Sequence, residues 1–489
     1  MSVWRVKPVS AFEADMKKSD LKRVLTRWGL TSLGIGAIIG GGIFTLTGIA
    51  AHDYAGPALA LAFVIAGIGC MFASLCYAEF ASVLPVEGSA YAYAYGTIGE
   101  LFAWFIGWNL VLEYMMGATT VAVAWSGYFV KLLHLFHVEV PLQWCNDLST
   151  AIEKSAALGM EAPTWAFNLP AFIITWLVTY VLVKGIKEAA NTNNVIVIVK
   201  IAVVLFVIVV GAFYINTDNW TPFIPDEVKT VAEDGSTKIN FGFGGVLTAA
   251  TIVFFAYIGF DAVSTQSGEA INPKKDVPFA IIASLIICTV LYILVSLVLT
   301  GMVRYDQLDK AAPVASAFSG IGINWAVFII TIAATAGLTS VMLVMMLGQS
   351  RIFLGMAKDG LLPRSLFATL HPKFKTPYKS TILIGALISI IASVTPIDKI
   401  SQMCSMGTLL AFAMVCVAVM ILRYKKPELE RPYRTPAVYV VGTLGVLFNL
   451  FLMTQVRKET WIAFILWGGL GIIVYFLYSK NNSNLNKTE

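Results

Sequence analysis

The chain carries a long succession of apolar runs, and this feature limits its possible folds more than any other. A helix that crosses a bilayer needs about 20 predominantly apolar residues. Twelve such runs occur, at 31–51, 57–83, 101–131, 169–187, 194–215, 245–268, 279–301, 324–349, 379–395, 400–423, 437–455 and 460–478. We therefore predict an all-α integral membrane protein with twelve transmembrane helices.

Composition agrees with this class and excludes the common soluble ones. Soluble domains are about 45–50% apolar and about 25% charged, whereas this chain of 489 residues is 58% hydrophobic and 13% charged. Residues 1–30 are polar and basic, without the apolar core of a cleavable signal, so we expect them to form a cytoplasmic N-terminal segment. The net charge of +5 reflects topology, and no nucleic-acid partner is expected.

The positions of Lys and Arg predict the orientation of the spans. With the N-terminus in the cytoplasm, the segments on the inner side carry 24 of the 34 basic residues and the outer segments carry nine, while Lys200 lies inside the fifth run. Inner loops are enriched in Lys and Arg. We therefore predict a multi-pass protein of the cell membrane with both termini, including the tail 479–489, in the cytoplasm.

The first run is interrupted by three successive glycines, Gly40, Gly41 and Gly42. Glycine costs about 1 kcal/mol relative to alanine inside a helix. Unwound backbone at membrane depth is tolerated only where it is buried in protein or lines a cavity. Small residues can also serve close helix packing, but three in a row favour a discontinuous helix.

The sixth run has a second candidate break around Gly259. The first and sixth spans are equivalent members of two five-helix halves, where paired breaks indicate a transporter binding site. The amides at a half-helix N-terminus attract a carboxylate, and carbonyls at a half-helix C-terminus accept hydrogen bonds from an ammonium. The two breaks together therefore suit an α-amino acid.

Short motifs along the chain resemble one family of transporters. They are GGGIF (40–44), AGP (55–57), LCYAEF (75–80), GSAY (88–91), GEL (99–101), GWN (107–109), GFD (259–261), GE (268–269), NP (272–273) and MAKDGLL (356–362). In this order they resemble the cationic amino acid transporter branch of the amino acid–polyamine–organocation superfamily, in a bacterial form. Many animal members have fourteen spans, whereas this chain has twelve runs.

The resemblance implies a five-plus-five inverted-repeat (LeuT-like) fold, with helices 1 and 6 discontinuous and two extra C-terminal helices. The first repeat would span 31–215 and the second 216–423, followed by the last two helices within 424–478. The substrate carboxylate would meet the amides of Gly41, Gly42 and Ile43. The ammonium would meet the carbonyls of Ile38, Phe255 and Ile258. Phe255 would be the aromatic gate that closes over the substrate, and Ala256 also belongs to the implied substrate-binding set.

Ionisable residues inside the runs are costly and usually functional. Lys200 could be a lysine that reaches back to the interface. The resemblance instead implies that it approaches the break in the first helix and couples transport to protons, because burial makes a neutral amine accessible. Glu113 could contact a cationic side chain or the substrate ammonium, and Asp261 could bind water, the substrate ammonium or free amides. Glu79 is interpreted as an interfacial or structural acid.

Met345 is expected to set substrate preference. Methionines in spans are usually packing residues, but in an alignment on the 356–362 motif Met345 stands where eukaryotic cationic members carry a smaller residue. We hypothesise that it shortens the side-chain pocket and favours small neutral amino acids such as alanine, with cationic ones also possible.

Other classes of function fit less well. The six Cys and four His have no metal-ligand or disulfide spacing, so no metal, cofactor or enzymatic activity is expected. No repeated acceptors or charge rings suggest an ion channel. The sequence thus predicts a proton-coupled amino acid symporter with protons, membrane lipids and an amino acid as its partners. An amino-acid exchanger, a membrane amino-acid sensor and a small membrane subunit as a further partner stay open.

Overall fold

The computed structural model describes residues 4–8, 23, 25–84, 89–184, 186–231, 237–310 and 312–487. Within them, eight stretches are helical, long and apolar enough to cross a membrane, and three further apolar helices are shorter. The first stretch, Arg27–Val83, contains two of the predicted runs, so each predicted run coincides with helix. The chain is thus a helical membrane protein.

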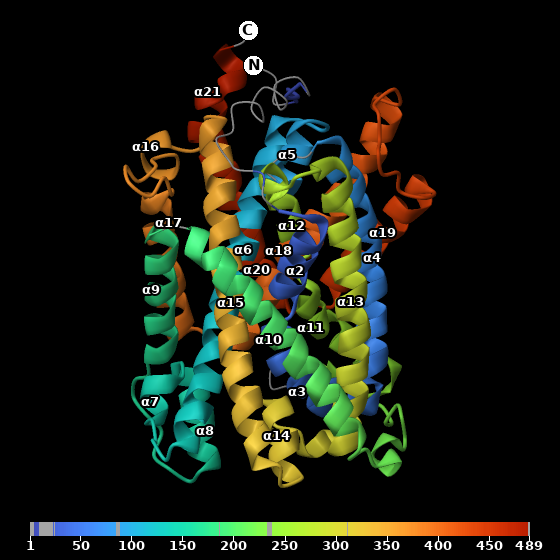
Figure 1. Cartoon of the computed structure of the whole chain (residues 1–489), viewed down its shortest axis with the longest axis vertical. Coiled ribbons are helices and arrows are strands. Elements are labelled where there is room, and N and C mark those ends of the chain that lie inside the picture. Colours follow the sequence, from blue (N-terminus) through green and yellow to red (C-terminus); the bar gives the residue numbers. More distant parts are fainter. Residues whose placement is uncertain are drawn as a thin grey trace.

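The helices run side by side in one bundle (Figure 1). They are α2 (Arg27–Ile38), α4 (Leu59–Val83), α6 (Glu100–Leu135), α9 (Leu169–Lys184), α10 (Ile186–Ala212), α11 (Gly242–Phe254), α13 (Pro273–Met302), α15 (Asn324–Lys358), α17 (Tyr378–Val394), α18 (Ile397–Lys425), α19 (Val438–Thr454) and α20 (Lys458–Val474).

Shorter elements cover the two ends of the bundle. At one end lie α5 (Ser89–Tyr95), α16 (Arg364–Phe367), α21 (Lys480–Asn482) and both ends of the chain, and at the other lie α7 (Leu142–Cys145), α8 (Leu148–Ala157) and α14 (Pro313–Gly320) (Figure 1). An antiparallel hairpin of β1 (Val228–Val231) and β2 (Thr237–Asn240) connects α10 to α11. This hairpin is a small exception to the all-α prediction.

One predicted connection is shorter than expected. The predicted runs 169–187 and 194–215 leave residues 188–193 as a connection, whereas the backbone is already helical from Ile186, where α10 begins. The residues after Ile186 include Lys, Glu and two Ala, which are good helix formers. The polar residues lie outside the apolar run, as predicted, but they do not lie outside the helix.

Both predicted helix breaks are present. The first lies between α2 and the π-helical turn η1 (Gly42–Leu46), which continues through α3 (Thr47–Ala50) and η2 (Ala51–Ala55). The second lies between α11 with its 3₁₀ turn η5 (Phe255–Tyr257) and the short α12 (Ala262–Thr265). At Ile39 and Ile258 the backbone leaves helical geometry, with ψ values of 101° and 130°.

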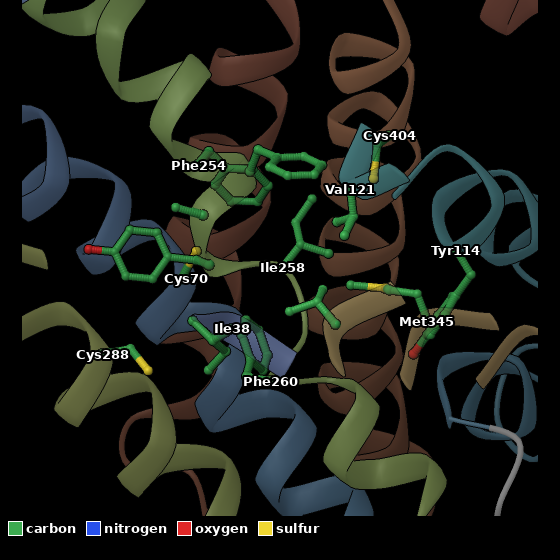
Figure 2. Packing of buried hydrophobic residues seen from close by; sticks show 14 of the residues in the cluster. Ile38, Cys70, Tyr114, Val121, Phe254, Ile258, Phe260, Cys288, Met345 and Cys404 are labelled. Carbon is green, nitrogen blue, oxygen red and sulfur yellow. The ribbon is translucent and has the colours of Figure 1, made fainter. Parts of the chain in front are cut away.

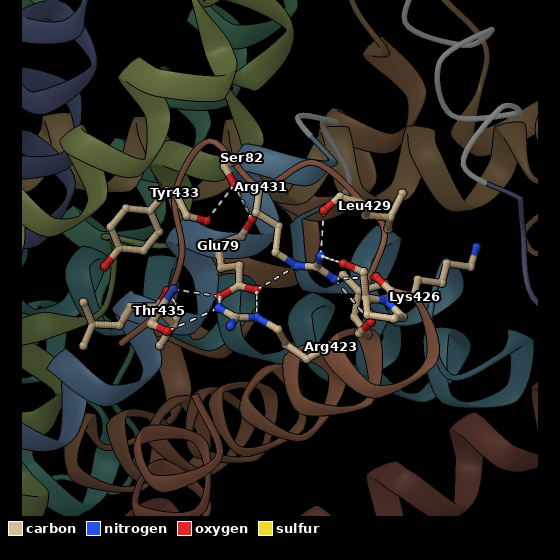
Figure 3. A network of polar contacts seen from close by, with 11 residues as sticks. Glu79, Ser82, Arg423, Lys426, Leu429, Arg431, Tyr433 and Thr435 are labelled. Atoms are coloured by element: carbon tan, nitrogen blue, oxygen red, sulfur yellow. Dashed lines mark hydrogen bonds and ion pairs between the residues drawn. The ribbon is translucent and has the colours of Figure 1, made fainter. Parts of the chain in front are cut away.

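A buried ion-pair network joins α4 to the end of α18 and to the connection between α18 and α19 (Figure 3). Arg423 donates to both carboxylate oxygens of Glu79, at 2.8 and 2.7 Å, and the Thr435 amide donates to one of them at 2.8 Å. Arg431 Nε lies 3.2 Å from the other oxygen. A fully buried carboxylate is thereby surrounded by donors, which agrees with the structural role predicted for Glu79.

Candidate functional site

The two helix breaks meet backbone to backbone. A Cβ atom on Gly42 would lie only 2.3 Å from Cα of Ala256. A Cβ on Gly259, whose φ is +126°, would lie 2.8 Å from the carbonyl carbon of Ala37. Only glycine fits at these two positions, because any side chain would force the halves apart. The glycines therefore determine how closely the two broken helices approach each other.

Tyr292 of α13 joins the two breaks through one hydroxyl group. Its Oη lies 2.8 Å from the carbonyl oxygen of Ile38 and 3.0 Å from that of Ala256. One proton can serve only one acceptor at a time, so the second contact is an alternative partner of the same O–H group. This residue was not predicted, since a tyrosine in an apolar run has no local signature of its role.

The first break presents amides at one end and carbonyls at the other. The first hydrogen bond after the break runs from the Phe44 amide to the Gly40 carbonyl, at 3.3 Å. The amides of Gly41, Gly42 and Ile43 precede it, where a helix leaves its first N–H groups without an intrahelical acceptor. These amides carry the positive end of the half-helix dipole, which attracts an anionic group.

The second break supplies acceptors from a short 3₁₀ turn. The Phe255 carbonyl accepts the Ile258 amide at 3.2 Å, so one of its lone pairs is used within the turn. The side chains of Phe255 and Ile258 are both buried, at 6% and 3% exposure. Phe255 is thus an interior residue next to the break, where the sequence reasoning placed a gate.

Lys200 of α10 reaches the first break from the side. Its Nζ donates to the carbonyl oxygens of Gly36 and Ile39, at 2.8 and 2.9 Å, and the side chain is fully buried. A Cβ on Gly337 of α15 would lie 2.9 Å from Lys200 Cε, so α15 closes over the lysine stem. The ammonium sits at the C-terminal end of α2, where a cation is favourable. It does not reach back to the interface.

Two buried carboxylates lie near the second break. Tyr114 of α6 donates to Oδ2 of Asp261 at 2.9 Å. Glu113 directly precedes Tyr114 in the sequence and packs against α18, where a Cβ on Gly407 would lie 3.5 Å from Glu113 Cβ. Among the described residues, neither carboxylate oxygen of Glu113 has a hydrogen-bond partner. The structure thus places Asp261 directly beside the second break, whereas Glu113 lies at the contact between α6 and α18.

Met345 of α15 lies on the apolar side of this region, near Ile258, Tyr114 and Cys404 (Figure 2). A Cβ on Gly117 of α6 would lie 3.5 Å from Met345 Sδ and 3.4 Å from Cys404 Sγ. The thioether is 3% exposed and fills the space left by the glycine. Met345 is thus a buried residue at the contact between α15 and α6.

Comparison with known proteins identifies the family. Residues 25–478 match the amino acid permease family. The chain belongs to this family. Over nearly all of both chains, this permease is 44% identical to the branched-chain amino acid permease BcaP of Bacillus subtilis strain 168, with 99% of each covered. It is also 43% identical to the methylthioribose transporter of the same strain, over 99% of this chain and all of that one.

Eukaryotic relatives are more distant. The permease is 37% identical to the vacuolar cationic amino acid transporter 4 of Arabidopsis thaliana, over 83% of this chain and 64% of the relative. Together these matches confirm the resemblance predicted from the short motifs. The protein is a multi-pass membrane transporter of the amino acid permease family and not an enzyme.

Proposed function

We propose that this permease is a secondary active transporter of amino acids in the cell membrane, with proton-coupled symport by alternating access. One observation carries the proposal: the amide end of one broken helix and the carbonyl ends of both meet at a single buried point. A carboxylate and an ammonium on neighbouring atoms match this arrangement of opposite partial charges. The family membership of the chain supports the same conclusion.

The substrate backbone would bind at the breaks. The amides of Gly41, Gly42 and Ile43 would receive the carboxylate, and the carbonyls of Ile38, Phe255, Ala256 and Ile258 are the candidate acceptors for the ammonium. The contact of Tyr292 with the carbonyls of Ile38 and Ala256 would hold these oxygens in place. Asp261 would add negative charge on the ammonium side.

A five-plus-five inverted repeat would give this site its access to both sides of the membrane. In such folds one helix bundle moves against the other around a fixed midplane site. The candidate site residues are all buried, which is the arrangement expected when neither path is open. Phe255, buried beside the second break, would then act as the gate.

Lys200 would couple transport to protons. A buried ammonium held by two carbonyls at the break links its protonation to the geometry of the substrate site. Loss of the proton would remove the positive charge and weaken both hydrogen bonds to the Gly36 and Ile39 carbonyls, because a neutral amine is a poorer donor than an ammonium. No other Lys or Arg among the described residues is fully buried, so this side chain is the natural candidate for the coupling group.

The preferred substrates would be neutral amino acids with small or aliphatic side chains. The side-chain end of the site meets Met345, Ile258 and Cys404 (Figure 2), which offer no partner for a cationic head group. The relative named for branched-chain amino acids supports an apolar substrate. Glu113 could serve a cationic side chain only by turning from α18, so cationic substrates are expected to be weaker.

Uptake into proteoliposomes tests the proposal. Radiolabelled alanine, valine and leucine are offered with and without an inward proton gradient, and with internal unlabelled amino acid. We expect saturable uptake that the gradient stimulates. Uptake only with internal substrate would indicate an exchanger, and binding without flux would indicate a sensor. Because methylthioribose has neither an ammonium nor a carboxylate, its uptake in place of amino acids would refute the proposed site.

A variant at Met345 tests the substrate preference. We expect Met345→Ser to open the side-chain end of the site, so that arginine competes with labelled alanine far better than it does in the wild type. A gain of about tenfold corresponds to about 1.4 kcal/mol. Met346→Ser, on the next residue of the same helix, is the control. An unchanged ratio of alanine to arginine inhibition would contradict the role of Met345.

A further inference from the structure

A groove of about 460 Å³ lies on the surface at the end of the bundle where both chain ends meet. Its walls come from four separate parts of the chain: the N-terminal segment, the turn between α5 and α6, the end of α18 and the start of α19. The lining residues are Trp4, Ile98, Met420, Ile421, Tyr424, Lys425 and Tyr439. The volume is within the range of about 300–1,000 Å³ that small-molecule sites have.

The walls of the groove are apolar except for one cation. Trp4, Tyr424 and Tyr439 are more than half exposed, and Lys425 is exposed as well. Among the described residues Lys425 forms no ion pair, whereas Arg423 on the same turn is used by Glu79. In the part of the chain that the structure describes, no acidic residue lines the groove. An apolar slot with aromatic edges and an exposed ammonium fits a molecule with a hydrocarbon tail and an anionic head.

The groove continues into the part of the surface that faces hydrocarbon. Beyond Tyr439, the outward face of α19 exposes Val440, Leu444 and Leu447, at 59%, 44% and 59%. In a membrane protein such a face lies against acyl chains. Aromatic residues and lysines mark the level of the lipid head groups. The groove therefore crosses the boundary between the hydrocarbon and the head groups on one membrane face.

We propose that this groove binds an anionic phospholipid, with an acyl chain along Ile421 and Tyr439 and the phosphate at Lys425. The lipid would also hold the N-terminal segment in place. Trp4 packs against the start of α6, where its ring lies 5.4 Å from that of Phe102, and the next residue, Arg5, pairs with Glu100 at 3.4 Å. Occupancy of the groove would therefore favour the docked position of this segment.

Quenching of Trp4 by brominated lipid tests the proposal. Wild type and Trp4→Phe are reconstituted in vesicles containing either brominated phosphatidylglycerol or brominated phosphatidylcholine, and the difference between the two proteins isolates the Trp4 signal. We expect phosphatidylglycerol to quench Trp4 at lower mole fraction than phosphatidylcholine, by about fivefold, the factor that about 1 kcal/mol per lysine near the surface gives.

Two lysine variants complete the experiment. Lys425→Gln is expected to remove the preference for phosphatidylglycerol, while Lys275→Gln, an exposed lysine at the start of α13, is expected to keep it. Equal quenching by the two lipids in the wild type, no quenching of Trp4, or an unchanged preference in Lys425→Gln would each overturn the proposal. Protection of Trp4 from quenching by both lipids would instead indicate that a protein subunit fills the groove. That result would also overturn the proposal.

Discussion

Tyr292 is the residue on which the geometry of the two breaks depends most directly. Its hydroxyl is the polar group that contacts the carbonyls of both Ile38 and Ala256. We expect Tyr292→Phe to lower the free energy of unfolding by about 1–3 kcal/mol, because a buried carbonyl is left without its donor, and to weaken substrate binding. Thermal unfolding and the KM for uptake measure the two effects.

Tyr475→Phe is the matched control for this prediction. The Tyr475 hydroxyl donates to Glu100 Oε1 at 3.1 Å and is equally buried, but its acceptor lies at the start of α6, away from both breaks. We expect it to lower stability by a similar amount with little change in KM. If both variants raised KM alike, Tyr292 would have only a general packing role.

Lys200 is a buried ionisable residue whose ammonium contacts the first break. We expect Lys200→Gln to abolish the stimulation of uptake by an inward proton gradient, a loss of about tenfold or more, while exchange of internal for external substrate persists. The control is Lys184→Gln, since the Lys184 ammonium lies over the ring of Tyr180, 4.7 Å from its centroid, at the end of α9. Gradient-driven uptake by Lys200→Gln at the wild-type rate would exclude the coupling role.

Single residues were predictable only where their own neighbours in sequence carried a signal. The glycine run marked the first break, and Lys200 was conspicuous as a charge within an apolar run. The roles of Tyr292 and of the partners of Glu79 were not predictable. Their hydrogen-bond partners lie far away in the sequence; Arg423, for example, is 344 positions from Glu79. Such pairings depend on how helices pack, which no local pattern records.

At the scale of elements, the contact between the broken helices is set by Gly42. We expect Gly42→Ala to prevent the halves from packing, because its Cβ would lie 2.3 Å from Ala256, and to reduce both the yield of monodisperse protein and uptake. Gly41→Ala is the control, since its Cβ would lie at an ordinary 3.6 Å from Leu338. Size-exclusion chromatography and uptake of both variants measure the difference, and a well-behaved, active Gly42→Ala would contradict the proposed close approach.

The elements themselves were largely predictable. Apolar length located each membrane helix to within a few residues at most ends, since the bilayer requires that length of any span. Predictions failed where helix continued past the apolar run, as in α10 from Ile186 and α15 to Lys358. There polar helix formers extend the helix beyond the membrane, and hydropathy has no information about them.

On the scale of the whole molecule, two features predict which end of the bundle faces the cytoplasm. They are the positions of the basic residues and the meeting of the two chain ends. The N-terminal segment and the C-terminal residues share contacts with the same face, because Arg5 and Ser483 both contact Glu100. The segments that the sequence assigns to the side of the two chain ends carry 24 of the 34 Lys and Arg residues, and loops enriched in Lys and Arg are typical of the cytoplasmic side. We therefore expect Lys275 to face the cytoplasm and Lys458 the outside.

Cysteine labelling of intact cells measures this orientation. All six native cysteines are buried, so the wild type should react little with a membrane-impermeant maleimide. Lys458→Cys is expected to react in intact cells, whereas Lys275→Cys should react only after the membrane is opened. Both positions are exposed, so a difference in reaction reports the side of the membrane and not burial. The reverse pattern would invert the topology and place the groove at Lys425 in the outer leaflet.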